Sequence, residues 1–242
     1  MLPWRSCHDI IKHPKQGCIK FPGCIGSFFQ GSQRSDFEDV RGRVIAFSVN
    51  VPRLIGMLEA AFKEWAIIVE SLGRGDQILI MRKGGLDEGP RGFEIQHARF
   101  WLFPTAYHQQ RDQVTSEAAA RWTEESGENN QDQTVLVRYG CEIVRHFELT
   151  RPEQITALRG HHVWSDKTLL QRMTWGNRDC LHALVVRTFE ARKPCEIPMH
   201  GDYGGCKSWI HLHTVPDEQN ARPVLNTDGF EQKLLSLMQA IS

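Results

Sequence analysis

The second half of the chain carries the pattern that most constrains its fold: long runs of strand-forming residues with few regular helices between them. Thr134 to Leu149 is rich in β-branched residues, Leu181 to Glu190 is the strongest strand signal, and Lys207 to His213 is a further strand. Because few strand–helix–strand units repeat, a doubly wound parallel sheet is disfavoured. The sequence therefore predicts an α+β fold, a curved or barrel-like, mainly antiparallel sheet of six or seven strands with two to three helices.

Helices are expected where capping residues precede apolar periodicity. The segment Thr150 to Glu153 fits a capping box with a proline in the first turn, so a helix should start there and stop near Gly160. Ser165 and the following aspartate should cap a second helix. A third is expected within residues 105–125, with Thr105 as its N-cap.

Shorter strands are expected earlier in the chain. Trp65 to Glu70 alternates like a half-buried strand, Gly73 to Asp76 supplies a turn, and Gln77 to Lys83 is the returning strand of a hairpin. A third strand should run from Arg99 to Phe103 and end at Pro104, because proline cannot donate a ladder hydrogen bond.

The sequence divides into three parts. Residues 1–56 lack a sustained period and are predicted to be a poorly ordered extension or a non-native start, with Met57 as the initiator; a small N-terminal module is the alternative. Residues 57–215 should form a single α+β domain, and residues 216–242 a C-terminal tail with a short helix. Within the domain, Ser126 to Gln133 is a polar linker without an apolar anchor.

Composition indicates a cytoplasmic protein. The 242 residues contain no apolar run near the roughly 20 residues that span a bilayer, and the N-terminus lacks the order of a secretory signal. The seven cysteines are odd in number, irregularly spaced and without a CxxC pair, which argues against a disulfide framework. Reduced, partly buried thiols and no membrane partner are expected.

Net charge is zero but unevenly distributed. From Met1 to Gly56, eight basic against four acidic residues give +4, and from Arg111 to Asp132, two basic against six acidic residues give −4. A protein that tracks an extended nucleic-acid backbone usually has a strong basic excess. The balance therefore disfavours extended tracking and leaves open a small pocket that reads one or two nucleotides.

Two blocks of the sequence concentrate aromatic and polar residues. The first is Phe100 to Gln109, and the second runs from His161 through Arg172 and Trp175 to Trp209. Aromatic pockets with a few convergent polar groups are the usual form of a ligand site. We therefore expect the two blocks to meet at one half-buried surface; the alternative is that each packs a separate core.

Four stretches carry a resemblance to a known family: Ala61 to Trp65, Ile80 to Gly85, Phe100 to Gln109 and Tyr203 to Trp209. In these stretches the sequence resembles the domain-of-unknown-function 1802 family, over about Met57 to Leu212. The resemblance implies no established activity. It implies only a contextual association with restriction-modification components.

Each candidate constellation has a structural alternative. Arg82 and Lys83 before two glycines could form an anion-binding lip, although a solvated hairpin end is commoner. His108 could act near a helix N-terminus with Arg99 as an anion clamp, or both could be local structural partners. No nucleotide-triphosphate motif occurs and no cofactor is indicated.

Metal chemistry has weaker support. Pairs of His and Cys occur at Cys180 and His182, at His211 and His213, and at His161–His162, but their spacing matches no recognised zinc motif. Structural hydrogen bonding is commoner for such residues, so no metal ligand is assigned. Catalytic cleavage through Mg²⁺ is disfavoured, because no clustered carboxylates with a lysine appear on consecutive strands.

The leading hypothesis is a binding module whose aromatic and basic pocket recognises nucleic acid, a base or a small anionic ligand in a restriction-modification or defence context. The alternative is a metal-independent enzyme with His108 or His162 as general base and an arginine clamp. No oligomeric state is indicated. The candidate ligand-binding residues are Arg82, Lys83, Arg99, His108, His162, Trp164, Arg172, Tyr203, Lys207 and Trp209.

Overall fold

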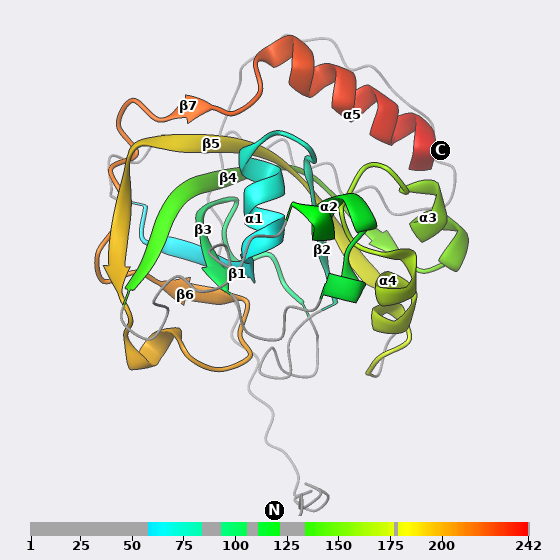
Figure 1. Ribbon diagram of the computed structural model, residues 1–242, viewed down its shortest axis with the longest axis horizontal. Helices are drawn as coiled ribbons and strands as arrows, with labels where there is room; N and C mark the ends of the chain where they lie inside the picture. The colour runs from blue at the N-terminus through cyan, green and yellow to red at the C-terminus, as the bar shows by residue number, and fades with distance from the viewer. Residues whose placement is uncertain (1–57, 84–92, 106–110, 122–133, 177–178, 242) are drawn as a thin grey trace, which may run out of the picture. The chain divides into compact units, whose positions relative to one another are not determined.

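The computed structural model describes residues 58–83, 93–105, 111–121, 134–176 and 179–241, which Figure 1 draws as a coloured ribbon. The strands in this part of the chain are β1 (Ala60–Trp65), β2 (Leu79–Arg82), β3 (Arg99–Thr105), β4 (Thr134–Leu149), β5 (Leu181–Pro198), β6 (Trp209–His211) and β7 (Arg222–Pro223). The helices are α1 (Ala66–Gly73), α2 (Ser116–Ala120), α3 (Pro152–Ala157), α4 (Asp166–Met173) and α5 (Thr227–Ile241), with short 3₁₀ turns η2 (Arg111–Gln113) and η4 (Gly201–Tyr203).

All of these strands belong to one curled sheet. Its order is β2-β5-β4-β3-β1-β6, and β7 pairs with β5. Only β1 and β3 are parallel among the pairs of the described strands; the others are antiparallel. The α+β class with a curved, mainly antiparallel sheet is confirmed. The described residues form five α-helices. Helix α5 lies in the C-terminal part, where a short helix was expected, and the four others exceed the expected two to three because the segment of α1 was predicted to be a strand.

The curvature comes from the two longest strands. β4 and β5 pair along most of their length and bend together in Figure 1. Their register shifts between Val137 and Tyr139 and again between Ile143 and Arg145, and such bulges increase local twist and bend a strand. Between the bulges lies Gly140, where an added Cβ would lie 2.4 Å from the ring of Phe189, so only glycine fits this close approach.

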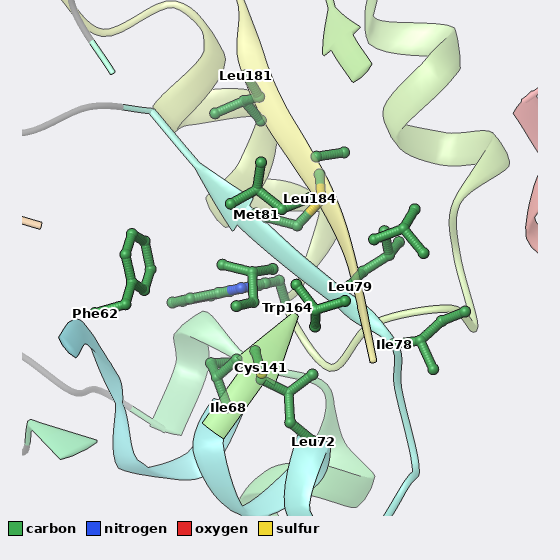
Figure 2. Close-up of a cluster of buried hydrophobic side chains, with 14 of the residues drawn as sticks. Phe62, Ile68, Leu72, Ile78, Leu79, Met81, Cys141, Trp164, Leu181 and Leu184 are labelled. Carbon is green, nitrogen blue, oxygen red and sulfur yellow. The ribbon is translucent and has the colours of Figure 1, made fainter. Parts of the chain in front are cut away.

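Both faces of the sheet are buried. Successive side chains of a strand point to opposite faces, so Phe62, Phe100 and Leu102 belong to the larger core, whereas Ala61 and Trp101 belong to a second cluster on the other face. Figure 2 shows part of the larger core. Its labelled side chains are Phe62, Ile68, Leu72, Ile78, Leu79, Met81, Cys141, Trp164, Leu181 and Leu184.

The expected strand from Trp65 to Glu70 is wrong, because β1 ends at Trp65 and helix α1 follows directly. Ile67, Ile68 and Val69 are all buried. A helix that is buried on nearly every side has no polar stripe, so its apolar run imitates a strand. The expected hairpin is therefore a strand–helix–strand segment, with β2 as the strand after α1.

The expected long helix within residues 105–125 is also wrong. Thr105 is the last residue of β3 rather than an N-cap, and Pro104 lies inside that strand. A short helix, α2, begins only at Ser116, where the side chain of Thr115 accepts a hydrogen bond from the backbone N–H of Ala118. Residues 106–110 lie outside the described part.

The two capped helices begin close to their expected positions. Ser165 caps α4, and its hydroxyl accepts a hydrogen bond from the N–H of Thr168. For α3 the cap is Arg151 instead of Thr150, because the helix begins at Pro152 and its third residue, Gln154, accepts through Oε1 from the N–H of Arg151. Gly160 follows α3 with φ +85°, the left-handed conformation that favours glycine.

The C-terminal helix α5 packs on the larger core through Phe230 and Leu237. The expected extension over residues 1–56 and the polar linker over residues 126–133 lie outside the described residues. None of the described helices is both long enough and apolar enough to cross a membrane.

Candidate functional site

A cavity of about 610 Å³ opens beside the carboxyl ends of β1, β2 and β3. This volume lies within the range of small-molecule ligand sites, about 300–1,000 Å³. The described residues that line it are Lys63, Trp65, Arg82, Lys83, Phe103, Pro104, Thr105, Val135, Arg172, Trp175, Met199, Tyr203, Gly204, Gly205, Cys206 and Lys207.

The topology of the sheet places these residues together. Because β1 and β3 are parallel, their carboxyl ends lie side by side, with Lys63 opposite Phe103 and Trp65 opposite Thr105. The last turn of α4 contributes Arg172, Trp175 follows that helix, and the segment after η4 contributes residues 204–207. Residues of both aromatic blocks thus line one cavity.

Two lysines connect the segments around the cavity. Lys63 Nζ donates to the carbonyl oxygens of Tyr203 at 2.7 Å and Gly205 at 2.8 Å, which attaches the loop after η4 to β1. Lys83 Nζ donates to the carbonyl oxygens of Met173 and Cys180 and so joins the end of β2 to the end of α4. Both ammonium groups therefore shape the cavity that they line.

Arg82 is held in a fixed orientation at the cavity. Its Nε and Nη2 donate to Oγ of the buried Ser208 at 2.9 and 2.7 Å, and its guanidinium lies over the ring of Phe62, 5.0 Å from the centroid. Nη1 of Arg82 does not donate to Ser208. A guanidinium fixed in this way is preorganised to bind an oxygen anion.

Arg172 is stacked on two indole rings. Its guanidinium carbon lies 4.0 Å from the ring centroid of Trp164 and 4.9 Å from that of Trp65. Burial lowers the pKa of Arg172, the charge of Glu64 acts in the opposite direction, and the charge of Arg82 lowers it further. The site therefore holds two half-buried cations near each other.

Glu64 lies buried beside these two arginines. It is only 2% exposed; Oε1 accepts a hydrogen bond from the N–H of Trp65, and Oε2 has no hydrogen-bond partner in the described part of the chain. Burial raises the pKa of Glu64, while Arg82, the Trp65 hydrogen bond and Arg172 lower it by smaller amounts. Its carboxyl group therefore offsets the charge of the two arginines incompletely.

Aromatic rings complete the cavity lining. Trp65, Phe103 and Tyr203 are buried or half-buried, whereas Trp175 is 53% exposed. Three large hydrophobic side chains are exposed among the described residues, and of these three Trp175 lines the cavity. An exposed indole beside cationic groups suits stacking with a planar ligand.

The sequence-based candidates are only partly brought together. Arg82, Lys83, Arg172, Tyr203 and Lys207 line the cavity. Trp164 lies beneath Arg172 instead of at the surface of the cavity. His108 lies outside the described residues.

Three candidates lie away from the described cavity lining. Arg99 is 3.8 Å from a carboxylate oxygen of Glu218 and stacks on Phe189. Trp209 is buried, and its Nε1 donates to the carbonyl oxygen of Glu94. His162 is 5% exposed; burial lowers its pKa to about 4, and neither ring nitrogen has a hydrogen-bond partner among the described residues.

The sequence-based list omits several residues of this site: Lys63, Trp65, Phe103, Trp175 and the buried Glu64. Lys63 and Trp65 alternate with Glu64 on β1. A strand assignment for residues 60–65 would have put the lysine and the tryptophan on one face and the glutamate on the other. This alternation is the sequence signal that could have identified Lys63 and Trp65 as residues of the site.

The fold and the site thus define this protein as a curled α+β domain with a cavity lined by cationic and aromatic side chains. The chain belongs to the family called domain of unknown function 1802, which matches residues 61–235. No curated protein matches the sequence.

Solved structures give only distant similarities. ASCH from Zymomonas mobilis is 13% identical with a TM-score of 0.37, and the match covers 74% of this chain and 94% of that one. A tyrosine-to-phenylalanine mutant of the same protein is 15% identical with a TM-score of 0.35, covering 74% and 97% of the two chains.

Replacing Glu64 by glutamine should reveal the raised pKa of its carboxyl group. A group whose pKa is higher in the folded state than its ordinary value of 4.5 stabilises the fold while protonated, and that contribution is lost as pH rises through the folded pKa. Glu64→Gln should therefore gain thermal stability relative to the wild type as the pH rises above 4.5, the ordinary pKa of the carboxyl group. Melting curves of both proteins measure this, and a relative loss on raising the pH would contradict the raised pKa.

Proposed function

We propose that this domain binds single-stranded nucleic acid and holds one or two of its nucleotides in the cavity. The observation that carries the proposal is the charge of the cavity. Among the described residues, five cationic side chains line it and no carboxylate does. Like charges that lie close together repel each other, so a bound phosphate would offset the repulsion between the half-buried Arg82 and Arg172.

The aromatic lining favours a nucleotide over a simple anion. Bases stack on Trp, Tyr and Phe, and arginine can contribute further contacts to their faces. Trp175 is the most accessible of the rings that line the cavity. A cavity of this size suits bases that are out of a duplex, which favours a single strand. The zero net charge of the chain agrees with a local contact instead of extended backbone tracking.

The remaining hypotheses stay predictions. An enzyme with a histidine general base would now rest on His108, because His162 is not among the described residues that line the cavity. Association with restriction-modification components rests on the family resemblance alone, and a cytoplasmic location rests on the composition of the sequence.

Fluorescence anisotropy with short single-stranded RNA and DNA tests the proposal. Trp175→Ala should raise Kd roughly 5- to 150-fold, because base–aromatic stacking contributes about 1–3 kcal/mol per base. Lys207→Ala should weaken binding of all sequences and reduce its salt dependence. Neither residue is buried, so both variants should remain folded.

Arg192→Ala is the matched control, because it removes one exposed positive charge that is not among the described lining residues. Its Kd should stay close to that of the wild type. A mononucleotide assayed in parallel separates recognition of one nucleotide from recognition of a strand. The proposal fails if the wild type binds neither strand, or if all three variants bind alike.

A further inference from the structure

Three exposed side chains outside the cavity lining gather at η4. His200 Nδ1 and His213 Nε2 each lie 3.2 Å from Asp202 Oδ2, and the three potential ligand atoms all lie within 4.8 Å of one another. Among the described residues, this is the one group of three or more His, Cys, Asp or Glu side chains with such spacing. We propose that His200, Asp202 and His213 bind a Zn²⁺ ion.

The distances fit tetrahedral coordination. Zn²⁺ binds imidazole nitrogen and carboxylate oxygen at about 2.0–2.2 Å, so two ligands of a tetrahedral ion lie about 3.4 Å apart. The two distances to Asp202 Oδ2 are close to this value. Small rotations of the exposed imidazole rings would bring the two nitrogens to the same separation. Water would occupy the fourth position, and hard ions such as Mg²⁺ would be disfavoured by two imidazole ligands.

The backbone around the three ligands is already fixed by Tyr203. This residue is buried, directly follows Asp202, and its hydroxyl accepts a hydrogen bond from the backbone N–H of His213 at 2.8 Å. Its carbonyl oxygen accepts from Lys63 Nζ. The backbones of Asp202 and His213 are therefore held together without the metal, and binding orders mainly the side chains.

The ion would join η4 to the segment that follows β6. On binding it would replace two exposed contacts, that between the N–H of Asp202 and Nδ1 of His200 and that between Nε2 of His213 and Oδ2 of Asp202. Exposed polar contacts of this kind contribute little to stability. Because Tyr203 and residues 204–207 line the cavity, the metal would stabilise one side of it. The proposed ion stabilises the fold and does not depend on what the cavity binds.

Isothermal titration of the full, tag-free chain with Zn²⁺ tests the site. His213→Ala and Asp202→Ala should each remove one binding event or weaken it more than about 10-fold, because even losing a partner of a metal ligand costs about 10–100-fold. His211→Ala is the matched control: it removes a neighbouring exposed imidazole outside the triad and should bind Zn²⁺ as the wild type does. His200→Ala provides a third variant of the triad.

Two further readouts separate this site from cysteine ligation elsewhere in the chain. Zn²⁺ should raise the melting temperature of the wild type more than that of the triad variants. Co²⁺ bound at the triad should give ligand-field absorption without a thiolate charge-transfer band, and that part of the spectrum should vanish in His213→Ala. The proposal is overturned if the triad variants bind Zn²⁺ with the number of sites and the affinity of the wild type.

Discussion

Replacing Trp164 by alanine should lower the free energy of unfolding by about 3–5 kcal/mol, the usual cost of truncating a buried tryptophan. Trp164 is 1% exposed, lies 4.6 Å from Trp65 between ring centroids, and supports the guanidinium of Arg172. The substitution therefore removes core packing and the ring beneath a cationic group of the cavity. Chemical denaturation measures the first effect, and nucleic-acid binding of the remaining folded protein measures the second.

Trp164→Phe separates the ring from its polar atom. Nε1 of Trp164 is buried without a hydrogen-bond partner in the described part of the chain, so removing this N–H leaves no acceptor unsatisfied. A phenylalanine should keep much of the packing and the stacking with Arg172. The loss of stability should therefore be well below that of alanine. Equal losses for the two variants would contradict this account of Trp164.

Replacing Arg82 by methionine should raise the Kd for single-stranded nucleic acid roughly 10- to 150-fold, since hydrogen bonds to charged groups contribute about 1.5–3 kcal/mol. Methionine preserves much of the volume over Phe62 but removes the guanidinium. If Arg82 contacts a phosphate, the slope of log Kd against log salt should also fall by about one. Anisotropy titrations at several salt concentrations measure both quantities.

Arg82→Lys is the matched control for charge. It keeps the positive charge but loses the planar group that donates twice to Ser208. Its Kd should lie between those of the wild type and Arg82→Met. A folded Arg82→Met protein that binds with the affinity and salt dependence of the wild type would show that Arg82 makes no contact with the ligand.

The parts of the fold that the sequence predicts are those with long runs of strand-forming residues or clear caps. β4 and β5 run for 16 and 18 residues, and Ser165 caps α4 as expected. Helix α1 could not be predicted from periodicity, because its buried residues surround the helix axis. The curvature depends on bulges at pairings between distant residues, which no local pattern encodes.

The candidate site was predicted as a meeting of two blocks but not residue by residue. Arg99 and Thr105 are at opposite ends of β3, and a strand rises about 3.3 Å per residue, so Arg99 lies far from the cavity end of that strand. Trp209 lies on the edge strand β6, pairs with Phe62 and belongs to the larger core. Lys63 and Trp65 were missed because the strand that carries them was not assigned.

The central claim is that the cavity itself binds the nucleic acid, and the indole N–H resonances of the tryptophans test it most directly. Trp65 and Trp175 line the cavity, whereas Nε1 of Trp101 and Nε1 of Trp209 donate to carbonyl oxygens elsewhere in the fold. In ¹H–¹⁵N spectra recorded during titration with a short single-stranded RNA, the Trp65 and Trp175 signals should shift while those of Trp101 and Trp209 stay in place. Saturable binding that leaves the Trp65 and Trp175 signals unchanged would contradict the claim.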